Sequence, residues 1–366
     1  MPYQPRPGAV LDEIDTPALL LDLDAFEHNL NHMATFFADK PTSLRPHAKA
    51  HKCPEIALRQ LQAGAIGITC AKLGEAEVMV DAGVQDVLIA NEIVGAIKVH
   101  RLAALAWRAS LMVAVDDSAN VKELSEACQA KHSSLRVLVE IDVGMGRCGV
   151  QSSEDALRLA RQVIDAPALT LAGLMGYEGH LVMIPEPQER ATRVQQAMVP
   201  LLETVGLLDR EGIATGIVSG GGTGTYDMTG TSAPMTEIQA GSYILMDTTY
   251  LRIRPEFRPA LTLLSTVVSR PTAERIVTDA GMKAVTKEFG WPQAIEPEGL
   301  VVQALSEEHG KLLAKDPASV RISPGEKVRL IPSHCCTTMN LHDRLYVIRD
   351  GKLVDVWPIA ARGRAQ

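Results

Sequence analysis

Val87-Leu88-Ile89-Ala90 is an apolar run that is followed by a helical pattern over about 96–106 and then by a second apolar run, Leu111-Met112-Val113-Ala114-Val115. Short apolar runs on either side of a helix are typical of a βαβ unit, in which the two strands are parallel. Helices cover both faces of such a sheet, so its strands read as nearly continuous apolar runs. The stretch therefore predicts a parallel α/β domain.

The same alternation continues on both sides of this unit. Further apolar runs that read as short strands lie at 18–23, 42–44, 67–70, 137–141, 171–177 and 216–218. Together with the first two runs they make eight strands separated by helical patterns, a number that favours a closed (β/α)8 barrel of the TIM type over an open sheet. We expect the barrel to span residues 14–250.

The pattern changes after about residue 255. Six runs there read as strands separated by turn signals, at 260–268, 275–277, 301–305, 327–331, 344–348 and 354–358. Asp350-Gly351 is a typical hairpin turn pair. These features predict a second, all-β domain made of residues 1–13 and 251–366.

Composition excludes several classes of protein. The 366 residues are 46% hydrophobic and carry a formal charge of −8, whereas nucleic acid selects basic surfaces. No apolar run reaches membrane-spanning length. The six cysteines show no disulfide-framework spacing, which indicates a reducing compartment. We therefore expect a cytoplasmic protein that binds neither nucleic acid nor membranes.

The stretch Leu44-Arg45-Pro46-His47-Ala48-Lys49-Ala50-His51-Lys52 directly follows one predicted strand. A lysine at the end of a barrel strand can form a Schiff base with a carbonyl cofactor. Most lysines are instead solvated surface charges. We assign the covalent role to Lys49 and place His47 beside it.

Other polar residues also follow predicted strands, where barrel enzymes place their active sites. They are Lys72, Asn91, Glu92, Arg147, Tyr177, Glu178 and His180. Arg147 pairs either with an anion or with a carboxylate such as Asp142. His180 and Glu178 are candidates for a general base, and ordinary hydrogen-bonded side chains are the alternative.

A glycine-rich loop, Ser219-Gly220-Gly221-Gly222-Thr223-Gly224-Thr225-Tyr226, follows the predicted eighth strand. Consecutive glycines let backbone N–H groups approach an anion without interference from Cβ atoms. This position in a barrel is a usual phosphate site. A tight structural turn is the alternative, and the loop lacks the Gly-Lys-Ser/Thr of a Walker motif.

Near the C-terminus the chain reads Ile331-Pro332-Ser333-His334-Cys335-Cys336-Thr337-Thr338-Met339-Asn340. In a strand, residues i and i+2 face the same way, so His334 and Cys336 can bind one metal ion while Cys335 points elsewhere. Two protein ligands leave positions for water and substrate, which is a catalytic pattern. A buried thiol beside a hydrogen-bonded histidine is the alternative.

Five motifs together resemble one family. They are Arg45–Lys52, Gly146-Arg147-Cys148-Gly149-Val150, Gly220–Gly224, Glu237-Ile238-Gln239-Ala240-Gly241-Ser242-Tyr243, and Pro332-Ser333-His334 followed by Asn340-Leu341-His342-Asp343. In this order, over nearly the whole chain, they resemble the D-threonine aldolase and 3-hydroxy-D-aspartate aldolase group. These enzymes are related to the D-serine dehydratases and share the alanine-racemase-type fold.

The resemblance implies a homodimeric enzyme that uses pyridoxal 5'-phosphate (PLP), with Lys49 bound covalently to the cofactor. It places the phosphate on Gly221, Gly222, Thr223 and Gly224. It also implies that Arg147 lies near the phenolic oxygen of the cofactor and Tyr177 beside its ring. His334 and Cys336 would bind a divalent metal ion, with Zn, Mn, Mg or Co as the candidates.

The chain departs from the family at two places. The second metal ligand of the aldolases is usually aspartate, and a His-x-Cys pair such as His334 and Cys336 is the pattern of the D-serine dehydratase branch. The flanking sequence follows the aldolases. A thiolate favours Zn²⁺ or another softer ion over Mg²⁺ or Mn²⁺. Some aldolases place a histidine directly after the tyrosine that corresponds to Tyr177, whereas this chain has Glu178 there and His180 two residues on.

The expected activity is that of a lyase. It cleaves a D-3-hydroxy amino acid of the D-threonine or D-3-hydroxyaspartate type to glycine and an aldehyde. The main alternative is a dehydratase that acts on D-serine or D-3-hydroxyaspartate and releases a keto acid and ammonia. An amino-acid racemase and a non-catalytic PLP carrier are minor alternatives. The sequence does not specify the substituent at C3 of the substrate.

Overall fold

The computed structural model describes residues 5–366 and divides the chain into two compact units. The barrel unit consists of residues 33–49, 54–241 and 363–366. The β unit consists of residues 1–32, 50–53 and 242–362, described from residue 5 onward. The chain thus crosses between the units several times, and helix α1 (Leu23–Ala38) spans the division at residue 32.

The barrel unit contains eight parallel strands in the order β2-β9-β8-β7-β6-β5-β4-β3. The strands are β2 (Ser43–Leu44), β3 (Ile68–Cys70), β4 (Asp86–Glu92), β5 (Ser110–Val115), β6 (Leu135–Glu140), β7 (Leu169–Gly176), β8 (Ile217–Gly220) and β9 (Glu237–Ile238). A bridge between His47 and Thr69, in which the Thr69 N–H donates to Pro46 O at 2.9 Å, joins the two ends of this order. The predicted (β/α)8 barrel is confirmed.

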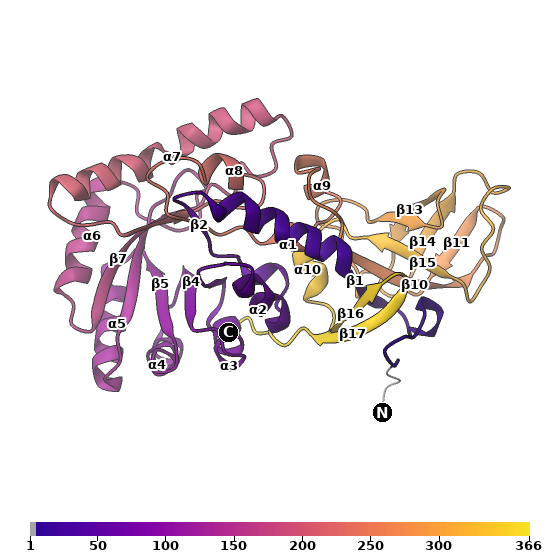
Figure 1. Ribbon diagram of the computed structural model, residues 1–366, viewed down its shortest axis with the longest axis horizontal. Helices are drawn as coiled ribbons and strands as arrows, with labels where there is room; N and C mark the ends of the chain where they lie inside the picture. The colour runs from indigo at the N-terminus through magenta and orange to yellow at the C-terminus, as the bar shows by residue number, and fades with distance from the viewer. Residues whose placement is uncertain (1–4) are drawn as a thin grey trace. The chain divides into compact units, whose positions relative to one another are not determined.

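Helices follow most of these strands. They are η2 (Ala48–Ala50), α2 (Pro54–Gln62), α3 (Leu73–Asp81), α4 (Ala96–Leu105), α5 (Ser118–Lys131), α6 (Ser153–Asp165), α7 (Pro187–Arg210) and α8 (Tyr226–Thr229). Figure 1 shows α4, α5, α6 and α7 outside the strands. Their apolar faces cover the sheet, and this is why β5 and β6 are buried along almost their whole length.

The β unit is built on a nine-stranded sheet with β1 in its interior. Its strands are β1 (Ala18–Asp22), β10 (Leu261–Ser269), β11 (Arg275–Thr278), β12 (Gln293–Glu296), β13 (Leu300–Leu305), β14 (Gly310–Ala314), β15 (Lys327–Ile331), β16 (Arg344–Arg349) and β17 (Lys352–Pro358). Short helical turns are η1 (Leu11–Glu13), η3 (Ser242–Ile244), α9 (Tyr250–Ile253) and α10 (Cys335–Met339). The six strands expected after residue 255 are present, and β12 and β14 were not predicted.

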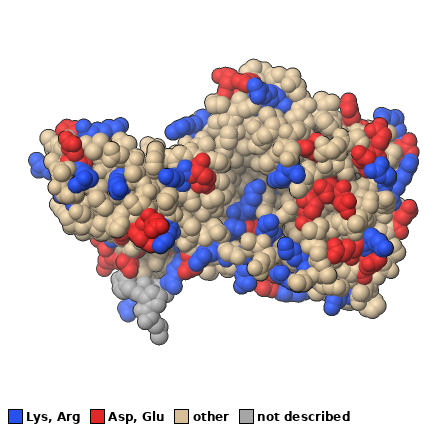
Figure 2. Space-filling view, turned by 180° about the vertical axis from the view of Figure 1, so that it is seen from behind, with Lys and Arg blue, Asp and Glu red and all other residues tan. Residues whose placement is uncertain are grey.

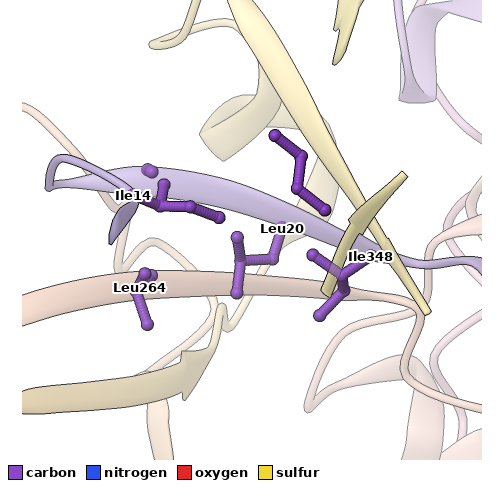
Figure 3. Packing of buried hydrophobic residues seen from close by; sticks show 6 residues of the cluster. Ile14, Leu20, Leu264 and Ile348 are labelled. Carbon is purple, nitrogen blue, oxygen red and sulfur yellow. The ribbon is translucent and has the colours of Figure 1, made fainter. Parts of the chain in front are cut away.

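The first apolar run does not belong to the barrel, so its assignment as a barrel strand was wrong. Strand β1 pairs antiparallel with β10 and parallel with β16. Its Leu20 packs in one cluster with Leu264 and Ile348, and Ile14 belongs to the same cluster (Figure 3). An apolar run before a helix shows that a strand is buried, but its periodicity does not identify the strand's partner.

The place in the barrel that was expected for β1 is taken by β9. This strand has only two residues, Glu237 and Ile238, and pairs with both β8 and β2. So short a run gives no periodic signal. The glycine-rich loop therefore follows the seventh barrel strand rather than the eighth, which is still a usual position for a phosphate site.

An ionic network that is buried at Arg45 and Glu237 and partly exposed at Asp86 and Arg136 links residues at or next to the ends of several barrel strands. Arg45, directly after β2, donates from Nε to Glu237 Oε2 at 2.9 Å and from Nη1 to Asp86 Oδ1 at 2.5 Å. Arg136 on β6 donates to the other Asp86 oxygen at 2.7 Å. The Arg45 and Glu237 side chains are only 3% and 2% exposed. The network thus links β2, β4, β6 and β9.

No helix of residues 5–366 is both long enough and apolar enough to cross a membrane. On the face drawn in Figure 2, acidic and basic side chains are interspersed among other residues on both units. The acidic residues that give the chain its formal charge of −8 therefore do not form a single patch on that face.

Arg45→Met should lower the free energy of unfolding by about 3–5 kcal/mol, because it leaves the Glu237 carboxylate buried without its cation. Arg108→Met is the matched control, since Arg108 pairs with Asp81 on the surface and such pairs contribute roughly 0–1 kcal/mol. Urea unfolding followed by circular dichroism measures both. Equal losses in the two variants would contradict a structural role of the buried network.

Candidate active site

Lys49, Tyr177 and Arg147 lie together in the barrel unit. Lys49 is half-buried in η2, just beyond β2, and its Nζ is 5.5 Å from the centroid of the Tyr177 ring. The Arg147 guanidinium carbon is 5.7 Å from the same centroid. Tyr177 directly follows β7, and Arg147 lies in the loop after β6. Since carboxyl ends of parallel strands meet at one end of a barrel, residues distant in the sequence converge here.

His47 supports the backbone at Lys49. It is buried, and its Nδ1 accepts a hydrogen bond from the Lys49 backbone N–H at 3.4 Å. The His47 backbone N–H in turn donates to Ala240 O at 3.1 Å, which ties it to the segment after β9. His47 therefore orients the turn that carries the lysine.

The glycine-rich loop after β8 is buried and tightly packed. Gly221 has φ +72°, a conformation that favours glycine. A Cβ atom on Gly224 would lie 2.0 Å from the Val182 carbonyl oxygen, so no larger residue fits without moving backbone. The loop is therefore packed closely against the Val182 backbone, and its Gly222 N–H donates to Thr225 Oγ1 at 3.1 Å.

Glu178 holds this loop in shape. It is fully buried and accepts hydrogen bonds from Gly221 N at 3.1 Å, from Thr225 Oγ1 at 2.7 Å and from Thr229 Oγ1. Both of its oxygens are thus engaged by the loop and the short helix after it. This geometry favours a positioning role for Glu178 over the general-base role expected from the sequence.

His180 is the more accessible of the two predicted bases. Its side chain is exposed, and a Cβ atom on Gly144 would lie 3.5 Å from its Nε2. It therefore lies next to the loop that also carries Arg147. Arg147 donates from Nη2 to Glu140 Oε1 at 3.4 Å, so its carboxylate partner is Glu140. Asp142 instead accepts from the backbone N–H groups of Gly144 and Gly146.

Two other predicted strand-end residues serve local structure. Asn91 donates from its side chain to Ala71 O at 2.9 Å. Lys72 is exposed and precedes α3 as its N-cap. Neither adds a group to the cluster around Tyr177.

In the β unit, His334 and Cys336 lie at the start of a helix, so the strand geometry expected for them was wrong. His334 is the N-cap of α10, and Cys336 is the second residue of that helix. The neighbouring Cys335 is fully buried, and its Sγ is 3.9 Å from Cys336 Sγ. Ser242 Oγ lies 3.6 Å from Cys336 Sγ on another side.

The His334 ring is held by two neighbours that sequence reasoning missed. Glu288 Oε1 is 2.7 Å from His334 Nδ1, and the Phe289 ring stacks on the imidazole at a centroid distance of 4.3 Å. With Nδ1 engaged by a carboxylate, Nε2 is the nitrogen that can bind a metal ion. Metal-binding histidines usually have such a carboxylate partner. Glu288 lies in the sequence Lys287-Glu288-Phe289, 46 residues before His334, and nothing in that sequence indicates a contact with the histidine.

The pKa values of the two candidate ligands shift in opposite directions. Burial opposes the change at His334, but the hydrogen bond and charge of Cys336 raise its pKa to about 9. Hydrogen bonds from Cys335 and His334, against the effect of burial, hold the pKa of Cys336 well below its usual range. The two shifts favour an imidazolium–thiolate pair, so a metal ion that binds both residues must displace the proton of His334.

Asp247 anchors the helix start that carries these ligands. It is fully buried and accepts from the backbone N–H groups of Cys335 at 2.9 Å and Tyr250 at 2.8 Å. Burial raises the pKa of its carboxyl group, against the effect of these hydrogen bonds. An imidazole Nε2 and a thiolate on a pinned helix turn form a donor set that suits Zn²⁺ or a similar soft-to-borderline ion.

The donor sets thus fit both groups that the sequence implied. The barrel unit offers a half-buried lysine beside an aromatic ring and a glycine loop that admits no Cβ at Gly224. The β unit offers one nitrogen and one sulfur ligand.

Comparison with known proteins identifies the family. The model of the alanine racemase N-terminal domain matches residues 21–249, and a serine dehydratase domain model matches residues 260–348. The chain is 43% identical to D-threonine aldolase of Arthrobacter sp., over 99% of this chain and 97% of that protein. It is 37% identical to 3-hydroxy-D-aspartate aldolase of Paracoccus denitrificans, over 98% and 95%.

A dehydratase is also among the relatives. D-threo-3-hydroxyaspartate dehydratase of Delftia sp. is 28% identical over 89% of this chain and 92% of its own length. The crystal structure of D-threonine aldolase from Filomicrobium marinum superposes with a TM-score of 0.95 at 42% identity, covering 98% of this chain and 99% of that one. The chain belongs to the alanine racemase N-terminal domain family, within the D-threonine aldolase and 3-hydroxy-D-aspartate aldolase group.

Proposed function

We propose that this protein is a PLP-dependent lyase that cleaves D-3-hydroxy amino acids to glycine and an aldehyde. The observation that supports this best is the cluster of Lys49, Tyr177 and Arg147. It lies beside a glycine loop that Glu178 holds by hydrogen bonding. The aldolase relatives match almost the whole chain, and their names indicate the same class of reaction.

The barrel unit would hold the cofactor and the amino-acid part of the substrate. Bound PLP supplies an electron sink for the bond that breaks at Cα. Lys49 Nζ would form the covalent attachment, and the loop Gly221–Gly224 would receive the phosphate, although the N–H groups of Gly221 and Gly222 already donate to Glu178 and Thr225. Tyr177 would lie beside the ring. Arg147 lies where a guanidinium can pair with an anionic oxygen, and His47 fixes the turn that aims the lysine.

The reaction also needs a group that takes the proton of the 3-hydroxyl. His180 Nε2 is the best candidate in the barrel unit, since His180 is exposed while both oxygens of Glu178 are engaged by the loop. Loss of that proton allows the Cα–Cβ bond to break and the aldehyde to leave.

His334 and Cys336 would hold a divalent metal ion through one nitrogen and one sulfur atom. A bound metal ion supplies a positive charge that lowers the pKa of a hydroxyl group it contacts. Glu288 keeps His334 Nε2 available for this, and Asp247 fixes the helix turn. A thiolate ligand favours Zn²⁺ or Co²⁺ over Mg²⁺.

A dehydratase is the second candidate, and Cys336 is the observation that favours it. By the family resemblance, a His-x-Cys pair is the pattern of the D-serine dehydratase branch, and the Delftia relative is named D-threo-3-hydroxyaspartate dehydratase. The same residues serve either reaction. Which bond at Cα or Cβ breaks depends on the orientation of the substrate on the cofactor.

The six cysteines are all free thiols in the described chain, which supports a cytoplasmic location. We propose that the protein acts as a homodimer, as the family resemblance implies.

Lys49→Ala should abolish both lyase activity and the visible absorbance of covalently bound PLP, because Lys49 Nζ lies over the Tyr177 ring, 5.5 Å from its centroid. Lys98→Ala, at an exposed position of α4, is the matched control and should retain both. Absorbance spectra of the purified chain with PLP measure the outcome. Survival of the absorbance band in Lys49→Ala would refute the lysine assignment.

Product analysis distinguishes the two candidate reactions. The protein is incubated with PLP and Zn²⁺ or Mn²⁺ in turn, and with D-threonine, D-3-hydroxyaspartate or D-serine, and glycine and ammonia are assayed separately. We expect glycine with an aldehyde and no ammonia, and the same products from Cys336→Asp, which restores the aspartate of the aldolases. Ammonia with a keto acid and no glycine would establish the dehydratase instead.

Glu288→Gln should weaken metal binding by about 10–100-fold, because it removes the carboxylate that orients His334 and raises its basicity. Titration of the metal-free chain with Co²⁺, followed by its absorption bands, measures the affinity without any substrate. Glu308→Gln is the control, since Glu308 pairs with Lys283 on the surface. Unchanged Co²⁺ affinity in Glu288→Gln would show that His334 does not bind the ion.

A further inference from the structure

Two glutamates end neighbouring parts of the barrel sheet. Glu92 is the last residue of β4 and Glu140 is the last residue of β6, with β5 hydrogen-bonded between them. The register of β4 against β5 shifts between Ile89 and Glu92. Such a bulge re-aims the side chain that follows it. The two carboxyl groups lie within hydrogen-bonding reach of each other.

The carboxyl groups of Glu92 and Glu140 lack a hydrogen-bond donor between them. Glu140 is 3% exposed, and its Oε1 accepts from Arg147 at 3.4 Å. Glu140 Oε2 and Glu92 Oε1 are both buried, and neither has a hydrogen-bond donor among residues 5–366. Two ionised carboxylates only accept hydrogen bonds and repel each other. A buried pair in this arrangement needs a positive species between the two groups, either a proton or a cation.

The surroundings are already negative. Asp116, after β5, and Cys148, in the loop after β6, have ligand atoms within 4.8 Å of one another and of Glu92. Asp116 Oδ2 accepts from the Gly149 N–H at 3.0 Å. Arg147 is the cation that pairs with Glu140, and it also lies over Tyr177. A third full negative charge beside Glu92 and Asp116 is therefore unfavourable.

We propose that Glu140 and Glu92 share one proton, and that the neutral Glu140 positions Arg147 without neutralising it. Arg147 then presents its full positive charge to an anionic oxygen, such as the phenolate of the cofactor. This inference rests on the proposed function for the identity of that anion, but not for the shared proton. Glu140 is accordingly a positioning residue.

The direction of the pKa change agrees with the geometry. Burial, and then the charge and hydrogen bond of Glu92, raise the pKa of Glu140 to about 8, while Arg147 acts in the opposite direction. The folded chain keeps a proton that the unfolded chain loses near pH 4.5, so the stability contributed by Glu140 is present at low pH and declines as pH rises to about 8. Burial and the same carboxylates raise the pKa of Cys148 to about 11, so its thiol does not titrate in this range.

Above about pH 8 the ionised Glu140 should neutralise Arg147 and weaken its hold on an anion. Glu140→Gln keeps an acceptor for Arg147 and adds an N–H donor for Glu92, so it imitates the protonated acid at every pH. Glu92→Gln acts in the opposite direction: it removes the repelling charge but not the burial, so the pKa of Glu140 falls and Glu140 ionises and pairs with Arg147 at a lower pH than in the wild type.

The test measures infrared spectra and PLP dissociation constants of the full chain between pH 6 and 10. In the wild type, and in the surface control Glu126→Gln, we expect a protonated-carboxyl band that titrates near pH 8. PLP affinity should fall several-fold over the same range. The band should be absent from Glu140→Gln and its affinity should not show this fall. Glu92→Gln should lose the band at a lower pH than the wild type, and its PLP affinity should begin to fall at that lower pH.

Three results would overturn the proposal. They are a titrating band that persists in Glu140→Gln, a uniform loss of affinity at all pH values in that variant, and a second bound metal ion per chain that is lost in both Gln variants. Asp247, whose pKa burial also raises, is unchanged in every variant, so any contribution from it cancels in the difference spectra. The band needs neither substrate nor cofactor, so its presence in a chain that fails to bind PLP would reject the proposed function and leave the shared proton in place.

Discussion

A carboxylate removed from water must be compensated, and the barrel unit meets this requirement in three different ways at three of its buried glutamates. Glu237 receives the guanidinium of Arg45, and the network formed there joins four strands. Glu178 receives one backbone N–H and two threonine hydroxyls. Glu140 faces Glu92 and Arg147.

Each solution gives a different property to the barrel. A guanidinium fixes register, because its planar donors reach two strands at once. A set of N–H and O–H donors shapes a loop, because each donor sets the position of one residue. A shared proton leaves a neighbouring cation uncompensated, which is the condition for binding an anion. The geometry of the barrel and the electrostatics of its site thus depend on the same kind of buried group.

The sequence predicted the architecture well where periodicity decides it, and less well where pairing decides it. Eight strands were expected and eight are present, but β1 lies in the other unit and the two-residue β9 replaces it. Burial of an apolar run follows from its composition. The identity of its neighbour depends on tertiary contacts, such as those of Leu20 with Leu264 and Ile348, that local sequence does not encode.

The candidate site divides in the same way, between residues that local sequence indicates and residues whose roles depend on tertiary contacts. Lys49, Tyr177, Arg147 and the glycine loop were found because their residue types and their place after a strand indicate their chemistry. Glu288 and Asp247 were missed because their roles arise only from contacts with His334 and Cys335, which are 46 and 88 residues away. Motifs thus predict candidates for ligand contact, whereas the groups that orient those candidates become visible only in the fold.

The change of His334 and Cys336 from a predicted strand to a helix start alters the chemical argument for the metal site. In a strand, Cys335 would point away and leave no effect on Cys336. In the first turn of α10, Cys335 Sγ lies 3.9 Å from Cys336 Sγ, and Ser242 Oγ lies on another side at 3.6 Å. These neighbours can donate hydrogen bonds to a thiolate, and they help to hold the pKa of Cys336 low.

A thiolate stabilised in this way is a weaker electron donor to a metal ion than an isolated one, because hydrogen bonds to sulfur withdraw charge from it. The hydrogen bonds therefore move the cysteine toward the donor strength of the aspartate that aldolases carry at this position. On this reasoning, the reaction depends less on whether the second ligand atom is sulfur or oxygen than on the groups that surround that atom. A His-x-Cys pair held by Cys335 and Ser242 is compatible with the aldolase reaction, even though the same pair elsewhere in the family accompanies dehydration.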